Sequence, residues 1–414
     1  AGGPGVQRVL KFAKYLPEFG WQPIILTVKN GEYPAIDETL VEEIPECCKV
    51  YKTNSIEPSF LYKKFTGMKA DEKIPVSVLA ERKVSWKKRL ANWIRLNLFI
   101  PDAKIGWIPY AVKEGKKVIR KEKPDIIFSS SPPPTVHLIA KKLAKWSKIK
   151  WVADFRDPWM EMAHFQNTKR SVITRCIDSK FEKSVFNKAV IITTISANMK
   201  KTLNSKIGAK KVEIIPNGFD EKDFVDLKFS RSKKLTISYA GNLSESRIPY
   251  CLFTALKKIK KQDPEFDFEF KIMGEVCSKF IEEIERNSLQ DNTKILGYLF
   301  HKDALEILMR SDVLLLVINN IPDNQGFVTG KLFEYLGCKK PIFAIGPVPG
   351  DANKILKETD SGVMIDYDDH KGSFDLLKLY YTNYKKDKNI HSFNNFGFDR
   401  KSLTKFLVDV FDKL

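Results

Sequence analysis

The chain has 414 residues, 43% of them hydrophobic and 12% aromatic, which suits two globular domains. No uninterrupted apolar run reaches the roughly 18 residues that a transmembrane helix needs. The net charge of +19 is uneven, because residues 1–227 hold 41 basic and 25 acidic side chains, a net of +16. The six cysteines form no CxxC pair and the five histidines show no metal-ligand spacing, which argues against a disulfide framework or a metal cage.

The first half alternates apolar segments with amphipathic ones. A helix is predicted over Val6–Phe19, ended by Gly20, and Pro23–Val28 is predicted to be a buried strand. Further strands are expected at 125–129, 150–154, 190–194 and 212–215, and helices at 109–122, 135–147 and 170–188. Continuous apolar strands separated by helices favour a parallel α/β sheet that is covered on both faces.

The second half repeats this alternation. Strands are expected at 235–240, 268–273, 293–296, 313–317, 341–345 and 362–365, with a last helix near 400–413. We therefore predict an N-terminal Rossmann-like domain over 1–225, a C-terminal one over 226–395, and a helix in 396–414 that packs back on the first domain. The polar stretch 220–232 is predicted to be the linker. Two doubly wound domains would face a cleft, and ligands bind at the carboxyl ends of such strands.

Residues 51–108 do not fit the alternation and are predicted to be a basic insertion. Residues 51–150 carry 23 basic and 8 acidic side chains. Leu90, Trp93, Ile94 and Asn97 share one helical stripe. Two interpretations stay open: a contact surface for an anionic membrane through residues 82–98, or a solvated helix packed on its own domain.

Two segments of the first half are candidates for ligand contacts. Gly2-Gly3-Pro4-Gly5 stands just before a helix, where backbone amides and the helix N-terminus favour an anion. A plain structural turn is the alternative there. Asp154, Arg156 and Asp157 follow a predicted strand, at the edge where a cleft would lie. The alternative for these charges is a salt bridge within the domain.

The sharpest segment is Gly326–Leu336 in the second half. Thr329 is predicted to be an N-cap, after which Gly330 and Lys331 present amides and an ammonium at a helix N-terminus. Glu334 lies one turn further, where a carboxylate could accept two hydrogen bonds from the vicinal diol of a ribose. A Lys–Glu surface pair is the alternative. This is not a P-loop, because Leu332 stands where that motif needs Ser or Thr.

Another glycine turn, Gly241-Asn242, ends a strand and is followed by Arg247, which suits a diphosphate. Together these segments resemble retaining glycosyltransferase family 4, which has the GT-B fold. The phrases that carry the resemblance stand in the family's order: AGGPGVQR, FGWQPIILTV, TTIS, IPNGFD, YAGN and TGKLFEYLGCKKPI. PDAKIGW, SSSPPPTVHL and ADFRDPW are similar to a subgroup linked to bacterial surface-polysaccharide assembly. Since the chain opens on the glycine loop, the fold's N-terminal strand is expected to be missing from it.

The resemblance implies roles for single positions. Glu334 matches the acid that binds the donor ribose, and Lys331 and Arg247 match the cations that hold the diphosphate. Gly274, Glu275 and Leu299 fall near the base pocket. The full set implied for donor binding is Gly2, Gly3, Gly241, Asn242, Gly274, Glu275, Leu299, Gly326, Phe327, Thr329, Gly330 and Glu334.

Two positions depart from the family's pattern. Gly326 stands where the first acid of an E-x7-E motif usually contacts the donor sugar, so the sugar's identity stays open. Many relatives have a histidine followed by an acid where this chain has Arg156-Asp157. Together with Lys331 and Arg247 these two residues are the catalytic candidates, and no base is assigned. The family implies retention without a side-chain nucleophile.

The expected substrate is a UDP- or GDP-linked sugar, with no cofactor and no metal, and the acceptor is a glycan or a lipid-linked molecule. We expect a cytoplasmic protein, either free or attached peripherally to the inner face of the membrane. Three alternatives remain. They are a sugar-nucleotide epimerase of the same fold, a basic nucleic-acid-binding protein, and a donor-binding protein without activity. For nucleic acid the sequence offers no recognition helix, zinc finger or aromatic platform.

Overall fold

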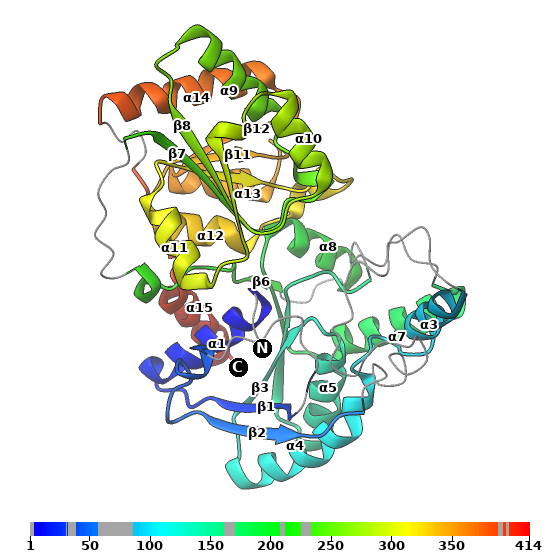
Figure 1. Cartoon of the computed structure of the whole chain (residues 1–414). Coiled ribbons are helices and arrows are strands. Elements are labelled where there is room, and N and C mark those ends of the chain that lie inside the picture. Colours follow the sequence, from blue (N-terminus) through cyan, green and yellow to red (C-terminus); the bar gives the residue numbers. More distant parts are fainter. Residues whose placement is uncertain are drawn as a thin grey trace. The chain divides into compact units, whose positions relative to one another are not determined.

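The computed structural model describes residues 4–29, 31, 39–56, 86–160, 170–207, 212–224, 233–387, 392–394 and 397–414. The chain divides into two compact units, one of Ala1–Pro216 with Thr404–Leu414 and one of Asn217–Leu403 (Figure 1). The last helix, α15 (Arg400–Asp412), therefore begins in the second unit and ends in the first. Over the described ranges, no helix is both long and apolar enough to cross a membrane.

The first unit contains parallel strands joined by helices, as predicted. β1 (Ile24–Val28) pairs with β2 (Lys49–Thr53), and a second sheet has the order β3-β4-β5-β6. The four strands of that sheet are Ile126–Ser131, Lys150–Phe155, Ile191–Thr194 and Val212–Ile214. The helices are α1 (Pro4–Tyr15), α3 (Trp86–Asn97), α4 (Ile108–Glu122), α5 (Thr135–Ser147), α7 (Val172–Lys188) and α8 (Ala197–Ile207).

Two sequence interpretations of this unit are wrong. β1 is only half-buried along its whole length, whereas a buried strand was predicted. Residues 51–108 are not wholly outside the alternation, because Lys49–Thr53 forms β2. Its residues KVYKT are mostly exposed, so the apolar pattern that marks a buried strand is absent. Only pairing with β1 in the fold identifies it as a strand.

Asn97, from the predicted stripe, lies buried at the end of α3. Its side-chain oxygen accepts hydrogen bonds from the Ser171 amide at 2.7 Å and from the Thr174 hydroxyl at 2.9 Å. Ser171 in turn caps α7 by accepting a hydrogen bond from the Thr174 amide. The polar member of the stripe therefore ties α3 to the start of α7.

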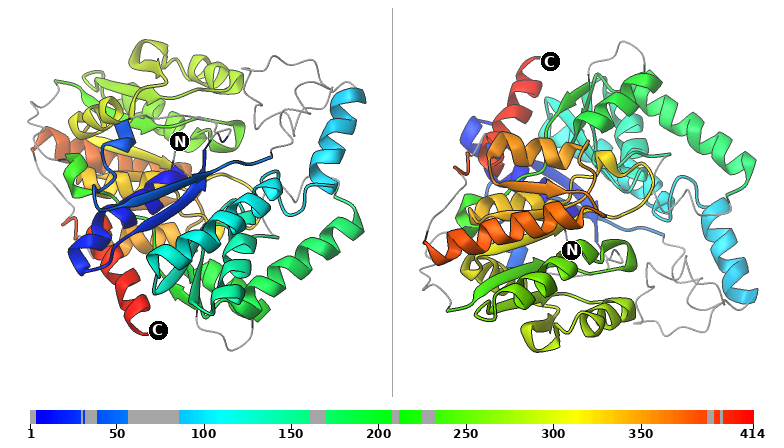
Figure 2. Two further views of the ribbon diagram at one scale, coloured as in Figure 1. Left: turned by 90° about the horizontal axis from the view of Figure 1, so that it is seen from below. Right: turned by 90° about the horizontal axis from the view of Figure 1, so that it is seen from above.

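The second unit is a six-stranded parallel sheet of order β12-β11-β10-β7-β8-β9. From β7 to β12 the strands are Leu235–Ala240, Phe268–Met273, Thr293–Gly297, Val313–Val317, Ile342–Ile345 and Gly362–Ile365. In β10, Val313, Leu315 and Val317 face one apolar cluster, whereas Leu314 and Leu316 face the other. The first cluster is completed by α9 (Tyr250–Gln262), α10 (Ser278–Arg286) and α14 (His370–Lys385). The second is completed by α11 (His301–Arg310), α12 (Gly330–Cys338) and α13 (Asp351–Thr359), so helices cover both faces (Figures 1 and 2).

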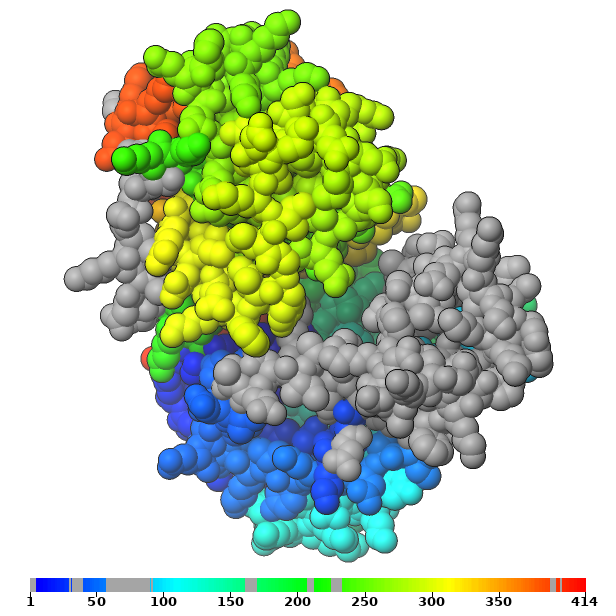
Figure 3. Space-filling view, in the orientation of Figure 1, coloured from blue at the N-terminus to red at the C-terminus, as the bar shows by residue number. Residues whose placement is uncertain are grey.

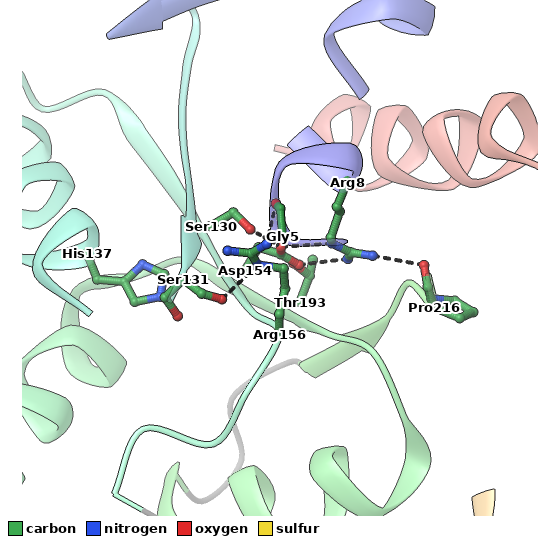
Figure 4. A network of polar contacts seen from close by, with 9 residues as sticks. All are labelled: Gly5, Arg8, Ser130, Ser131, His137, Asp154, Arg156, Thr193 and Pro216. Carbon is green, nitrogen blue, oxygen red and sulfur yellow. Dashed lines mark hydrogen bonds and ion pairs between the residues drawn. The ribbon is translucent and has the colours of Figure 1, made fainter. Parts of the chain in front are cut away.

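A buried ion pair organises the first unit (Figure 4). The Arg8 guanidinium on α1 donates two hydrogen bonds to the Asp154 carboxylate at the end of β4, at 3.0 and 2.8 Å, and both side chains are fully buried. Asp154 also accepts hydrogen bonds from Ser130 at 2.6 Å and Thr193 at 2.7 Å, and Arg8 donates to the Pro216 carbonyl at 2.8 Å. Burial by itself raises the pKa of Asp154, but Arg8 and the two hydroxyls bring that pKa below its ordinary value.

We expect Asp154→Asn to lower the free energy of unfolding by about 3–5 kcal/mol, because it leaves the buried Arg8 charge unpaired. Urea unfolding at neutral pH measures this. The folded-state pKa of Asp154 is depressed, so its contribution is present above the carboxyl's ordinary pKa and is lost as the pH falls through the folded value. Asp125→Asn, at an exposed position before β3, is the matched control and should stay within about 0.5 kcal/mol. Equal losses in both variants would contradict the role of the pair.

Candidate functional site

The strand order of the second unit has one switch point. β7 lies between β8 and β10, so the chain adds strands on one side of β7 and then on the other. In such sheets the loops after the two central strands diverge and leave a crevice at their carboxyl ends, where ligands bind. Here those loops carry Gly241 and Asn242 after β7 and Asn319 after β10. Topology alone therefore directs attention to the same turn that the sequence singled out.

Two glycines shape this turn. Gly241 has a φ of +117°, and a Cβ atom there would overlap the Lys331 ammonium. Gly274, after β8, has a φ of +143°, and its Cβ atom would lie 2.5 Å from the Gly241 carbonyl oxygen. Any other L-residue would meet backbone strain and a collision at both positions. The Gly241 amide donates to the Met273 carbonyl at 2.6 Å, which fixes the turn against β8.

Lys331, in the first turn of α12, reaches back over this turn. Its ammonium donates a hydrogen bond to the Tyr239 hydroxyl at 2.7 Å and lies 4.2 Å from the centroid of that ring. Burial, and after it the nearby Arg247 charge, lowers the pKa of Lys331 from 10.5 to about 7, although Glu334 acts in the opposite direction. Burial and the second cation both disfavour the charge on Lys331, and an anion bound beside it would stabilise that charge.

Arg247 connects the two sides of the switch point. It belongs to the short 3-10 helix Glu245–Arg247 and donates through Nε to the Asn319 side chain. Its Nη1 donates to the Asn242 carbonyl at 3.1 Å. The Asn242 side chain accepts a hydrogen bond from the Glu275 amide at 3.2 Å. The structure thus brings Gly241, Asn242, Arg247 and Lys331 into one cluster, with Gly274 and Glu275 beside it.

Helix α12 begins at Gly330, and Thr329 occupies the N-cap position with an extended backbone. The prediction that Thr329 is the N-cap residue is confirmed, although its hydroxyl makes no hydrogen bond to the helix. This hydroxyl oxygen is buried and has no hydrogen-bond partner within the described part of the chain. The first amides of a helix have no acceptor within it, so this terminus presents donors to an anion.

Glu334 lies one turn into α12 and is partly exposed. Its carboxylate is 3.3 Å from Nε2 of His301, the first residue of α11. The partner that the structure gives Glu334 is therefore a histidine, whereas the sequence alternative was a Lys331–Glu334 pair. His301 belongs to no motif, and its position beside Glu334 follows only from the packing of α11 against α12.

For three further predicted residues the structure gives only their local positions. Gly326 ends a short 3-10 helix after β10, and Phe327 is 39% exposed. Leu299 packs against the apolar cluster beneath α11 and α12. No three His, Cys, Asp or Glu side chains gather in a way that could hold a metal ion, as far as the described residues go.

Arg156 and Asp157 belong to the first unit, and Gly2 and Gly3 lie outside the described residues. The Arg156 guanidinium donates to three backbone carbonyls, those of Ser131 at 2.9 Å, Pro132 at 2.7 Å and Gly5 (Figure 4). A Cβ atom on Gly5 would lie 2.8 Å from Nη1 of Arg156. The salt-bridge alternative therefore applies to Asp154, which pairs with Arg8. Arg156 instead binds backbone carbonyls, including that of Gly5 at the start of α1.

Sequence reasoning missed His137, a fully buried residue on α5. Its ring nitrogens lie 2.8 Å from the hydroxyls of Ser129 and Ser131, which share one face of β3. Burial, with the Arg156 charge adding to it, lowers the pKa of His137 to about 3 although Asp154 opposes the shift, so the ring is neutral. Trp151 also donates to Ser129 at 2.8 Å. This closed network supports the strand ends rather than presenting a group to a substrate.

Part of this chain matches a known protein family: residues 70–223 match the model of Glycosyltransferase Family 4. A component of the human phosphatidylinositol N-acetylglucosaminyltransferase is 28% identical over 128 residues, 30% of this chain. The match covers only 26% of that relative's length.

Among solved structures, sucrose-phosphate synthase from Thermosynechococcus elongatus superposes with a TM-score of 0.63 at 13% identity. That match covers 100% of this chain and 94% of the other. Anabaena HepE, in complex with UDP-glucose, gives a TM-score of 0.59 at 13% identity and covers 100% of this chain and 98% of the other. The resemblance to glycosyltransferase family 4 is confirmed by the matched segment together with the shared architecture, and the chain has the GT-B fold.

Proposed function

We propose that this protein is a retaining glycosyltransferase that binds a nucleoside-diphosphate sugar in its second unit. The observation that carries the proposal is the convergence of Lys331, Arg247 and the α12 N-terminus at the switch point between β7 and β10. Two cations, helix amides and the Thr329 hydroxyl, which has no hydrogen-bond partner among the described residues, form a site for a diphosphate. HepE, which has the same fold, was solved with UDP-glucose.

In the proposed reaction the bond between the anomeric carbon and the diphosphate oxygen breaks on the same face on which the acceptor oxygen adds. The acceptor hydroxyl transfers its proton to the leaving diphosphate. Lys331 and Arg247 stabilise the negative charge that develops on that leaving group. Glu334 accepts hydrogen bonds from the ribose hydroxyls, and His301 orients its carboxylate. No side-chain nucleophile and no metal take part.

We propose a glycan or lipid-linked acceptor in cell-surface polysaccharide synthesis, at the cytoplasmic face of a membrane. The support is the likeness of PDAKIGW and ADFRDPW to a subgroup with that role, and the net charge of +16 in residues 1–227. Differential scanning fluorimetry against UDP-, GDP- and ADP-linked sugars identifies the donor. Product analysis with and without acceptor then separates transfer from epimerisation, because an epimerase converts the donor without an acceptor. A sugar-nucleotide isomer formed in the absence of acceptor would overturn the proposal.

Lys331→Ala should lower kcat by roughly 10²–10³-fold, because it removes a donor to the charge that develops on the leaving group. Glu334→Ala should mainly raise KM for the donor, since ribose binding is common to the ground and transition states. Steady-state kinetics with the identified donor measures both. Lys339→Ala, at the exposed C-terminal end of the same helix, is the control and should retain wild-type rates. Wild-type turnover in the Lys331 variant would place the site elsewhere.

Binding of the nucleotide sugar should take up a proton. The pKa of Lys331 is about 7 in the free site, because burial and then the nearby Arg247 lower it, although Glu334 favours the charged form. A bound diphosphate raises that pKa, so affinity is greatest below pH 7 and falls as the pH rises above it. Titration calorimetry at pH 8 in buffers of different ionisation enthalpy measures the uptake. Lys331→Arg, which stays charged, should abolish the buffer dependence. Equal buffer dependence in both proteins would assign the proton to another group.

A further inference from the structure

The outer surface of the first unit has an open groove of about 690 Å³ along α4 and α5. It belongs to none of the motifs discussed above. Five cations line it, four from α4 and one from α5: Lys113, Lys116, Lys117, Arg120 and Lys142. Three apolar side chains, Ile108, Pro109 and Val112, also line the groove. In Figure 3 the cyan surface of α4 is open to view at the edge of this unit, and Figure 2 (left) shows the same helix from below.

The positive charge of this groove is poorly neutralised. Lys117 pairs with Glu114 at 2.9 Å across one turn of α4, and both groups are at the surface. Such exposed pairs are weak and leave the field of the cluster largely intact. The structure gives Lys113, Lys116, Arg120 and Lys142 no carboxylate partner among the described residues. Neighbouring cations on α5 also repel one another: the pKa of Lys141 is lowered first by burial and then by Lys142 and Lys145.

Aromatic side chains lie at the rim of the same surface. Trp146, near the end of α5, is 38% exposed, and Lys116 and Arg120 each lie 5.3 Å from its ring centroid. Tyr110, in the first turn of α4, is 36% exposed. Lysine and arginine stems with exposed Trp and Tyr are the composition of surfaces that rest at a membrane interface, where apolar carbon meets charged headgroups.

We propose that this α4–α5 surface docks the protein onto an anionic lipid bilayer. The charge complements phosphate headgroups, and Ile108, Pro109 and Val112 supply apolar area in the same groove. Nucleic acid fits this surface less well, because the Trp146 ring on which a base would stack is already engaged by Lys116 and Arg120. This surface is separate from residues 82–98, for which the sequence left a membrane contact or a solvated helix open and where several side chains lie outside the described set.

The proposal does not rest on the nucleotide-sugar site, which belongs to the other unit. If the donor site were assigned wrongly, bilayer docking would be unaffected, and its failure would leave the transferase assignment standing. Docking would raise the concentration of lipid-linked or membrane-proximal acceptors near the protein. It would not require any contact with the sugar donor.

The test is flotation of the full chain with vesicles of phosphatidylcholine alone and of phosphatidylcholine with phosphatidylglycerol, at about 0.15 M salt. We expect binding to the anionic vesicles only. The variant K113E/K116E/R120E should reduce the floated fraction at least tenfold. A control variant, K257E/K260E/K261E, makes the same change of net charge on exposed positions of α9 and should float like the wild type. Thermal unfolding checks that both variants are folded.

Three outcomes overturn the proposal. If the groove variant floats as well as the wild-type chain, another surface makes the contact. Equal loss in both variants would mean that net charge alone drives adsorption. Retention of the wild-type chain by duplex DNA at the same salt, without flotation, would assign the surface to nucleic acid. Binding to anionic vesicles that is lost only in the groove variant supports the docking surface.

Discussion

The Arg8–Asp154 ion pair is the constraint on which the first unit depends. A fully buried charge is tolerated only when it is paired and hydrogen-bonded, and here one carboxylate receives hydrogen bonds from Arg8, Ser130 and Thr193. These partners come from α1, β3 and β5, so the pair fixes one helix against three neighbouring strands. The next charged residue along the chain, Arg156, then meets the backbone of Gly5 at the start of α1. The position of Gly5 at the start of α1 is thus tied to a buried interaction further along the same helix.

The switch point of the second unit differs from this ion pair. In the first unit Asp154 is paired with Arg8, and the neutral His137 lies between two serine hydroxyls. At the switch point of the second unit two cations face each other, and the Thr329 hydroxyl has no partner among the described residues. A buried cation beside a second cation costs free energy unless an anion joins them. An incomplete polar network at the carboxyl ends of β7 and β10 therefore marks where a ligand completes the structure.

The α4–α5 groove gathers five cations with little neutralisation. Other exposed cations of both units meet a carboxylate, as Lys49 meets Glu122 and Lys385 meets Asp263. An unneutralised surface keeps its attraction for a large anionic partner, and that attraction weakens with salt. The proposed donor site and the groove thus share one principle, since both leave positive charge for a partner from outside the chain.

Sequence patterns predicted the buried strands of the second unit. β7 and β10, for example, lie where the pattern placed them, and both are buried along almost their whole length. β2 was missed because KVYKT is mostly exposed, and it becomes a strand only through its neighbour β1. Thr329 lies at the N-cap position that the sequence predicted, because that position is a local feature. The direction of its hydroxyl depends instead on the surrounding packing.

By itself, the sequence determined the alternation of strands and helices, the family resemblance, and the identity of the cationic positions Lys331 and Arg247, because these follow from local pattern and residue type. The tertiary structure alone decided which groups meet. It paired Asp154 with Arg8 instead of Arg156, gave Glu334 the partner His301, and placed Lys331 on the ring of Tyr239. Such contacts join residues far apart in the chain, so they depend on strand order and helix packing, which no local pattern contains.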